Sequence, residues 1–241
     1  MARHQPQVHF MQAHGDMSGP FIPRQLVLDL DHSVSFARED FLSGPSNIAA
    51  LTLIERWPDW PSRMVALTGP EGSGKSHLAA IWADESGARE LSAKFLSIAD
   101  VPGTLATGAL VVEDLEAEDL DEHALFHLIN LAREEDAYVL LTSRNAVASL
   151  PVTIRDLASR LRALPAVIVT PPDDVLLRSL LIKLASDRQL ALDESVINFL
   201  VNRIDRSFAA ARNAIQTLDD EAMRRHRPVT RALAVELFRS P

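Results

Sequence analysis

The chain has 241 residues, of which 47% are hydrophobic and 24% charged, with a formal net charge of −9 and no cysteine. This composition is typical of a globular protein with one larger and one smaller domain, and it excludes disulfides and thiolate metal sites. The acidic charge and the lack of a long basic run disfavour strong direct DNA binding, since phosphate contacts supply most of that affinity. No apolar run reaches the roughly 20 residues that span a bilayer, so we expect no membrane segment and a cytoplasmic location.

The N-terminal region divides into two segments. Residues 1–20 are polar and without periodicity, which predicts a disordered tail. Residues 21–31 alternate apolar and polar side chains around Gln25, Leu26, Leu28 and Leu30. This alternation fits an edge strand or a docked tail, and it also fits an extended peptide that fills a partner's pocket.

Residues 32–170 are expected to form an α/β core. Apolar runs predict strands over Met64–Thr68, Ala109–Val112, Tyr138–Thr142 and Ala166–Val169, with a weaker one over Arg89–Ser92. Helices are predicted over Lys75–Glu85 and Glu122–Glu134, with a short one that begins near Thr153. Continuous apolar strands that alternate with helices indicate a parallel sheet covered on both faces.

After Pro171-Pro172 only helical periodicity remains, so residues 171–241 predict a smaller all-helical domain. We expect a first helix around Val175–Leu184, a second capped by Asp193, a third over Ser207–Arg225 and a fourth from near Thr230.

A glycine-rich loop follows the first predicted strand. Residues 69–76, GPEGSGKS, match the G-x-x-x-x-G-K-[ST] pattern. Its backbone N–H groups cradle phosphates, its lysine reaches the outer phosphates, and its serine hydroxyl binds Mg²⁺. We therefore predict that ADP or ATP binds here with Mg²⁺, and that the contacting residues are Gly69, Gly72, Ser73, Gly74, Lys75, Ser76 and His77.

Polar residues end the next two core strands. Glu113 and Asp114 follow an apolar run, where P-loop proteins place acids that hold Mg²⁺ and orient the attacking water. The alternative is a strand that simply ends in an acidic loop. Thr142 ends the following strand and is a candidate for sensing the γ-phosphate, although turn residues are equally common there. An extra strand between the two motifs would place the chain in the additional-strand branch of P-loop proteins.

Arg160 lies before the last predicted strand, in Ser159-Arg160-Leu161-Arg162. An arginine there can act as a finger that stabilises a transferring phosphoryl group in a neighbouring subunit, worth about 10³–10⁵ in rate. Spacing alone does not separate this role from a solvated arginine pair on a helix.

Over residues 24–240 the assembled pattern resembles the AAA+ family, within it the DnaA/Hda group of bacterial replication proteins. The segment from Phe41 to Asn47 is similar to the one that borders the adenine, which implies nucleotide contacts for both residues. The segment 157–161 resembles the box that carries the finger arginine, which falls on Arg160. Pro171-Pro172 looks like the start of the lid, and residues 25–30 resemble a peptide that binds the DNA polymerase III sliding clamp.

The resemblance implies a negative regulator of replication initiation. The loaded clamp would recruit the protein through Gln25, Leu26, Leu28 and Leu30, and Arg160 would then help to hydrolyse the ATP bound to the initiator DnaA. The lack of a DNA-binding domain after the lid favours this role over that of an initiator.

Two departures from the family pattern concern the chain's own nucleotide site. Ala209 occupies the position of the lid's sensor arginine, with Arg212 one turn away as a substitute, and Glu113 replaces the usual Asp. We therefore expect slow or absent intrinsic hydrolysis, with ADP as a structural ligand. Self-association into a homodimer stays open.

Two alternatives remain. An autonomous AAA+ ATPase that loads helicase would respond to single-stranded DNA, and a clamp-binding scaffold would be indifferent to loss of Arg160. Trp57 and Trp60 form an aromatic turn that serves either packing or a partner, and packing is the favoured interpretation.

Overall fold

The computed structural model describes residues 36–116 and 118–239, which belong to one compact unit that begins at Ser35. The predicted tail and the predicted clamp-binding residues Gln25, Leu26, Leu28 and Leu30 lie outside the described residues. Within the described ranges, no helix is long and apolar enough to cross a membrane.

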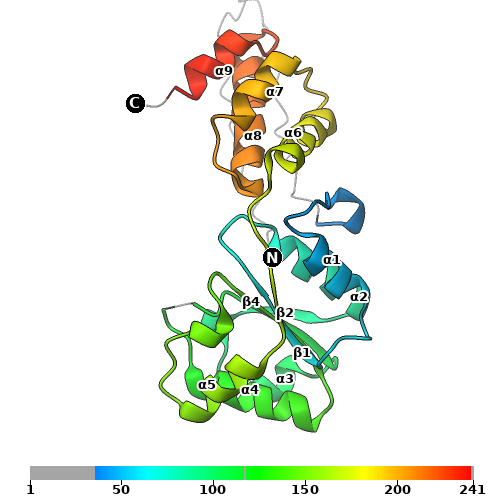
Figure 1. The fold of residues 1–241 in the computed structure, drawn as a ribbon, viewed down its shortest axis with the longest axis vertical. Helices are drawn as coiled ribbons and strands as arrows, with labels where there is room; N and C mark the ends of the chain where they lie inside the picture. Colours follow the sequence, from blue (N-terminus) through cyan, green and yellow to red (C-terminus); the bar gives the residue numbers. More distant parts are fainter. Residues whose placement is uncertain (1–35, 117, 240–241) are drawn as a thin grey trace, which may run out of the picture. The chain divides into compact units, whose positions relative to one another are not determined.

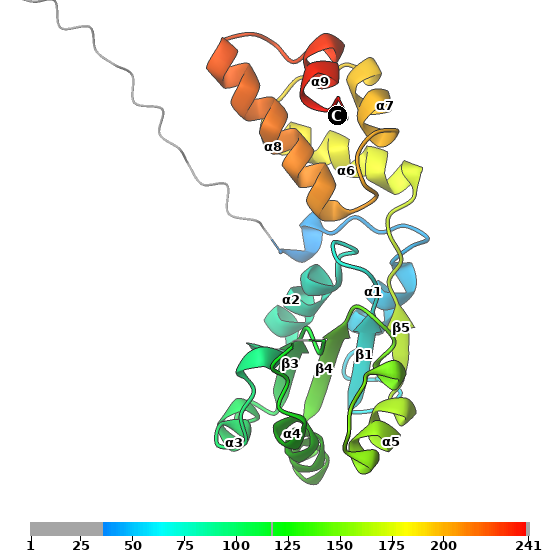
Figure 2. The ribbon, with the colours of Figure 1, turned by 90° about the vertical axis from the view of Figure 1, so that its left-hand side faces the viewer.

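A five-stranded parallel sheet forms the core, in the order β2-β3-β4-β1-β5. Its strands are β1 (Met64–Thr68), β2 (Arg89–Ser92), β3 (Ala109–Glu113), β4 (Tyr138–Ser143) and β5 (Ala166–Ile168). Figure 2 shows β3, β4, β1 and β5 side by side. The predicted strands are confirmed to within one residue at each end. β4 lies between β1 and β3, which is the inserted strand that the sequence pattern anticipated.

The central strands β1, β3 and β4 are buried on both faces because helices cover both, whereas the edge strands β2 and β5 are more exposed. Alternate β3 residues divide between two apolar clusters, Leu110 and Val112 on one face and Ala109 and Val111 on the other. The first face packs against α3 (Val101–Thr104), α4 (Glu122–Glu134) and α5 (Arg155–Ala163). The second packs against α1 (Ile48–Glu55) and α2 (Lys75–Ser86). Each fully buried Leu or Val contributes about 1.5–3 kcal/mol, so both faces anchor the sheet.

Three single-turn 3-10 helices complete the described core: η1 (Arg38–Asp40), η2 (Ala93–Phe95) and η3 (Val147–Ser149). The aromatic turn before β1 is a packing element, as favoured from the sequence. Trp60 is buried, its indole N–H donates to the Leu53 carbonyl at 2.7 Å, and its ring lies 4.9 Å from that of Trp82 in α2. The Trp57 and Trp60 rings both meet Tyr138 edge-on.

Four helices follow β5, as the change of periodicity predicted, and they appear together in Figure 1. These are α6 (Asp174–Asp187), α7 (Glu194–Val201), α8 (Phe208–Arg225) and α9 (Arg231–Leu237). They enclose their own apolar cluster around Leu177, Leu200, Ile215 and Leu218. Asp193 is the N-cap residue of α7, but its side chain makes no capping hydrogen bond, contrary to the expected cap.

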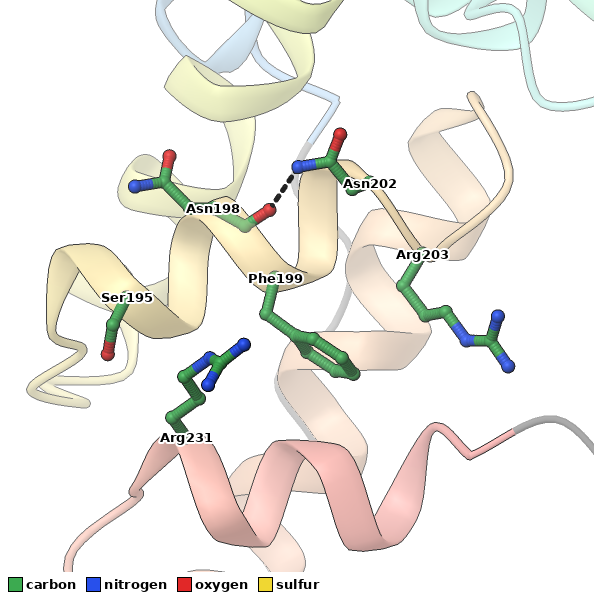
Figure 3. Close-up of a pocket in the computed structure, with 6 residues that line it drawn as sticks. All are labelled: Ser195, Asn198, Phe199, Asn202, Arg203 and Arg231. Carbon is green, nitrogen blue, oxygen red and sulfur yellow. Dashed lines mark hydrogen bonds between the residues drawn. The ribbon is translucent and has the colours of Figure 1, made fainter.

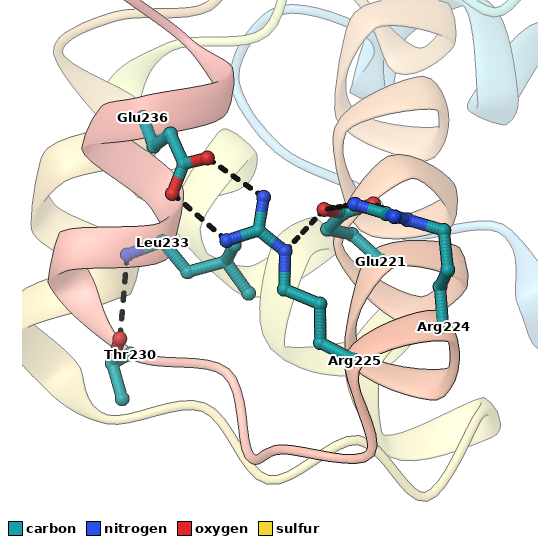
Figure 4. Close-up of polar contacts among 6 residues, drawn as sticks. All are labelled: Glu221, Arg224, Arg225, Thr230, Leu233 and Glu236. Carbon is teal, nitrogen blue, oxygen red and sulfur yellow. Dashed lines mark hydrogen bonds and ion pairs between the residues drawn. The ribbon is translucent and has the colours of Figure 1, made fainter.

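Ion pairs tie the last two helices together (Figure 4). Arg225 at the end of α8 contacts Glu236 of α9 with both terminal nitrogens, at 3.0 and 2.7 Å, and also pairs with Glu221. Thr230 caps α9 by accepting a hydrogen bond from the Leu233 N–H. The basic run that begins at Arg224 is therefore a helix end with acidic partners.

Candidate nucleotide site

The glycine loop connects β1 to α2, and its backbone requires glycine. Gly69 has φ 152°, and a Cβ there would lie 2.0 Å from the Val169 carbonyl oxygen. Gly72 has φ 71°, and its Cβ would lie 2.8 Å from the Ser207 side chain. The positive φ values and the close neighbours explain why no larger residue fits either position. The loop thus turns tightly into the N-terminus of α2, where helix N–H groups favour an anion.

Lys75 is the first residue of α2 and is buried. Its Nζ donates to the Gly69 carbonyl at 2.7 Å and to the Pro70 carbonyl at 2.9 Å, which holds the ammonium under the loop. Burial lowers the pKa of Lys75, while the nearby Asp114 and Glu116 oppose that shift. Ser73 Oγ is buried without a hydrogen-bond partner among the described residues, whereas Ser76 is exposed. A buried unpaired hydroxyl is unusual and marks a place for a ligand oxygen.

The predicted acids stand at the end of β3. Glu113 is the last strand residue, and its Oε1 is buried without a hydrogen-bond partner in the described part of the chain. Asp114 follows with φ 59°, and its N–H donates to Thr142 Oγ1 at 3.1 Å. The predicted sensor hydroxyl is therefore engaged with the acidic turn.

The donor set fits Mg²⁺, which prefers oxygen ligands and keeps several waters. The described residues hold no group of three or more His, Cys, Asp or Glu side chains able to bind a metal by themselves. Ser76, Glu113 and the phosphates of a nucleotide would supply the oxygens.

Glu116 is a site residue that sequence reasoning missed. Its Oε1 accepts hydrogen bonds from Ser143 Oγ at 2.7 Å and from the Asn145 N–H at 2.6 Å. Burial raises its pKa, but the hydrogen bonds from Asn145 and Ser143 outweigh burial, so the pKa is lowered and the group stays ionised. In the sequence Glu116 is one of several acids that follow β3, and only its position three residues after Glu113 offers a signal.

An aromatic group lies beside the loop. The His77 ring meets Phe36 and Phe41 edge-on at 5.3 and 5.1 Å, and Phe41 stacks with Phe208 of α8 at 6.4 Å. His77 Nε2 lies 3.0 Å from the Ala37 carbonyl oxygen, and burial lowers its pKa. Asn47 is buried and supports this segment: Oδ1 accepts from the Gly44 N–H and Nδ2 donates to the Leu42 carbonyl.

The start of α8 meets the glycine loop directly. The Phe208 N–H donates to the Gly72 carbonyl at 2.9 Å, and Ala209 Cβ would lie 3.6 Å from a Cβ on Gly72. Arg206 pairs with Asp174 of α6 at 2.8 Å. Arg212 is half-buried, burial lowers its pKa, and its charge lowers the pKa of His77. Of these two arginines, Arg212 is the one whose charge acts on α2, the helix that follows the glycine loop.

Arg160 lies inside α5, so the predicted short helix that begins near Thr153 extends past it. Leu157 and Leu161 bury one face of this helix, and the Glu122 carboxylate accepts hydrogen bonds from the Thr153 and Ile154 N–H groups at its start. The Arg160 guanidinium lies 5.3 Å from the centre of the Phe126 ring in α4. Its Nη1 is buried without a hydrogen-bond partner among the residues described.

A separate hollow of about 360 Å³ lies between α7 and α9. Figure 3 shows Phe199 and Arg231 pointing into it, with Asn202 Nδ2 donating to the Asn198 carbonyl at 2.7 Å. Arg203 donates to the Phe238 carbonyl at 2.9 Å. No residue predicted to bind nucleotide lines this hollow.

A protein-family model matches the helical region that follows β5. Residues 174–234 match a family model described as "Hda, lid domain". A chromosomal replication initiator protein DnaA 2 from Chlamydia caviae is 24% identical over 208 residues, which are 74% of this chain and 45% of that protein. The chain spans about half the length of the curated relatives it matches, 45% and 47% of two of them.

Solved structures share the fold. Domain III of the Thermotoga maritima replication initiation protein DnaA superposes with a TM-score of 0.69 at 20% identity, covering 86% of this chain and 98% of that one. A replication initiator DnaA bound to AMPPCP and single-stranded DNA gives 0.63 at 20% identity, covering 79% and 68%. The fold is therefore a parallel α/β sheet with a helical lid.

Proposed function

We propose that this chain, a DnaA-homologous AAA+ protein with a lid of the Hda type, is a negative regulator of replication initiation that acts on the ATP carried by the initiator DnaA. The lid match over residues 174–234 carries the proposal, because it joins an Hda-type lid to a DnaA-like core. The resemblance seen in the sequence implies that a chain with this core and lid regulates the initiator and does not open replication origins itself.

The nucleotide site supports binding of ADP or ATP with Mg²⁺ to this chain. The support comes from a buried lysine under the loop, an unpaired Ser73 hydroxyl and an unpaired Glu113 oxygen, which are a donor and acceptors suited to phosphates and Mg²⁺. Bound Mg²⁺ would supply charge neutralisation between phosphates. Phe41, Asn47 and His77 border the adenine side. Position 209 carries an alanine in place of the lid's sensor arginine, and Arg212 takes over that role.

Hydrolysis in this site is proposed to be slow. Ala209 lies beside Gly72 of the glycine loop and, unlike the usual sensor arginine, carries no charge. Glu113, one methylene longer, stands where the family usually has the Asp that holds Mg²⁺. We expect turnover by the chain alone below about 1 s⁻¹, under the usual range for enzymes. The nucleotide then serves mainly to hold the core and the lid in a binding-competent arrangement.

Arg160 is the group proposed to act in trans. The guanidinium rests over Phe126, with one nitrogen buried and unpaired, which leaves a donor whose burial costs about 1–3 kcal/mol. Rotation of the side chain toward a phosphoryl oxygen of the partner's ATP would relieve that cost. It would also neutralise charge that develops in the transition state.

Recruitment is proposed to run through the sliding clamp of DNA polymerase III. Gln25, Leu26, Leu28 and Leu30 would bind the clamp as an extended peptide. Loading of the clamp on DNA would then raise the local concentration of this chain near the initiator.

The experiment is to follow decay of initiator-bound labelled ATP to ADP with DNA-loaded clamp, ADP and this protein. We expect wild-type protein to accelerate decay, Arg160→Ala to abolish the acceleration, and the exposed neighbour variant Arg162→Ala to retain it. Gln25→Ala should lower the acceleration at limiting clamp.

No acceleration by wild-type protein would refute the proposed regulator. Acceleration that survives Arg160→Ala would refute the finger assignment alone. Equal clamp dependence of wild-type and Gln25→Ala protein would refute the recruitment step.

A further inference from the structure

Two hollows border α9 in the lid. The hollow between α7 and α9 has a volume of about 360 Å³, and a second, of about 470 Å³, lies between α8, the loop before it and the end of α9. Arg203 lines both, so its side chain is common to the two hollows. No residue of the glycine loop lines either one. The lid therefore carries a concave surface that the nucleotide site does not use.

The two lid hollows are basic, although the chain as a whole is acidic. Their linings contain three arginines, Arg203, Arg231 and Arg239, and one acid, Asp205. The formal net charge of the chain is −9. Arginines gathered around a concave surface attract negatively charged groups locally, whatever the total charge of the protein.

The arginines of the hollows also differ in their partners from most other arginines of the lid. Carboxylates pair with Arg178, Arg188, Arg206, Arg224 and Arg225. Arg231, by contrast, has no hydrogen bond or ion pair with any residue that the structure describes. Arg203 donates only through Nε, to the Phe238 carbonyl at 2.9 Å. Guanidinium groups without a carboxylate partner are available to bind an external acid through two parallel hydrogen bonds.

Apolar and amide side chains lie beside these arginines. Phe199 of α7 is half-buried and points into the first hollow together with Arg231 (Figure 3). Asn198 and Asn202 line the same hollow, and Arg178 of α6 donates to Asn198 Oδ1. An amide side chain offers both donors and acceptors, which suit the backbone of a peptide.

We propose that the two lid hollows bind an extended acidic peptide segment of a partner protein. An aromatic or leucine side chain of that segment packs against Phe199, and its carboxylates pair with Arg231 and Arg203. Arginine clusters recognise acidic motifs in this way, and the volumes of the hollows are those of small binding pockets. The proposal does not depend on the proposed function, because no residue predicted to bind nucleotide lines either hollow.

A peptide fits these hollows better than a nucleic acid does. Single strands are held by many phosphate contacts along a basic groove and by aromatic rings on which bases stack. Here three arginines share the two linings with an acid, and Phe199 and Phe238 are half-buried. An acidic peptide needs only one or two carboxylates beside an apolar anchor.

The test measures fluorescence anisotropy of the labelled peptide Glu-Glu-Asp-Leu-Phe-Asp-Glu-Glu with the full chain. We expect wild-type protein to bind it, Arg231→Glu to weaken binding by about 10-fold or more, and Arg227→Glu by less than about 3-fold. Arg227 is exposed, lies in the loop before α9 and lines neither hollow, so it is a control with the same change of net charge. Acids are favoured in the first turn of a helix, so Arg231→Glu should fold, which circular dichroism melts verify.

Further probes identify what the hollows recognise. The amide counterpart Gln-Gln-Asn-Leu-Phe-Asn-Gln-Gln should bind about 10-fold more weakly, because the carboxylates are gone. Replacing the Leu-Phe pair of the acidic peptide by Ser-Ser should also weaken binding, because the apolar anchor is gone. In ¹⁵N NMR spectra, the acidic peptide should shift signals of α7 and α9 and leave those of the glycine loop unchanged.

No binding of the acidic peptide, or equal losses in Arg231→Glu and Arg227→Glu, would overturn the proposal. Tighter binding of an oligo-dT strand that displaces the peptide and depends on Arg231 would instead make this a nucleic-acid site. A wild-type dimer in sedimentation that Arg231→Glu separates, without peptide binding, would assign the hollows to a second copy of the chain. The proposed regulator is measured separately, through decay of initiator-bound ATP, so the two proposals fail independently.

Discussion

The nucleotide edge of the sheet and the C-terminal half of the lid are built in opposite ways. At the carboxyl ends of β3 and β4, the half-buried Glu116 accepts hydrogen bonds from the buried Ser143 hydroxyl and from the Asn145 N–H. In the lid, the half-buried Arg225 pairs with Glu221 on its own helix and with the exposed Glu236 of α9 (Figure 4). Buried polar groups are costly unless they are fully paired, whereas exposed pairs are screened by water. Substitutions at the ends of β3 and β4 should therefore cost more stability than substitutions in the ion pairs of the lid.

The largest effect is expected from the apolar core behind the site. Trp82→Ala removes a fully buried ring from α2, the helix that begins at Lys75. We expect a loss of about 3–5 kcal/mol in the free energy of unfolding. Urea denaturation followed by circular dichroism measures it. Phe95→Ala, which removes a ring that is 64% exposed, is the control and should cost far less. Equal losses would contradict the described packing.

A smaller effect is expected from the half-buried carboxylate of Glu116. Glu116→Gln keeps the shape but removes the charge that two donors share, and we expect about 1.5–3 kcal/mol of destabilisation in urea at neutral pH. Glu118→Gln changes an exposed acid two residues away and should be nearly neutral. If Glu118→Gln costs as much, the effect comes from net charge and not from the hydrogen bonds.

The tie between the segment before α1 and the lid should matter less. Lys183 of α6 contacts Asp40 of η1 at 2.6 Å and Asp187 at 2.9 Å. Lys183→Met keeps the aliphatic stem and removes these pairs, and we expect about 0.5–1 kcal/mol, reduced at high salt. The same urea experiment at low and high salt measures it. A loss that does not depend on salt would indicate that the stem, and not the charge, stabilises the contact.

The smallest effect is expected in acid, in the surface network of the lid. Hydrogen bonds from Arg224 and then Arg225 lower the pKa of Glu221 to about 2. A carboxyl group with a lowered folded pKa stabilises the fold above its unfolded pKa of about 4.3, and this contribution is lost as pH falls toward 2.

Carboxyl ¹³C NMR should therefore give Glu221 a titration midpoint near 2 in the wild-type protein. Arg224→Ala should move that midpoint toward 4.3, the ordinary value for glutamate. A wild-type midpoint already near the ordinary value would show that the pairs are broken in solution. The contrast between the two regions would then be larger than the structure suggests.

Local patterns determined much of this protein. The strand ends, the start of α2 at Lys75 and the span Glu122–Glu134 follow from apolar runs and from the glycine motif. These features depend on neighbours in the chain, because buried parallel strands must be apolar and a phosphate loop needs glycine. Four lid helices after Pro172 were also readable from their periodicity.

Other features were decided only by the tertiary structure. The run IAALTLIE of α1 buries Ala50, Leu51 and Ile54 against the sheet, but apolar residues such as the exposed Ile48 hide this helical stripe in the sequence. Glu116 and Arg144 gain their partners from β4 and from the glycine loop, more than 20 residues away in sequence. The position of Arg160 inside α5 and over Phe126 depends on the packing of α4. Sequence spacing indicates which residues can act in a site. Long-range packing decides which of them come into contact, because side chains interact only within a few ångströms.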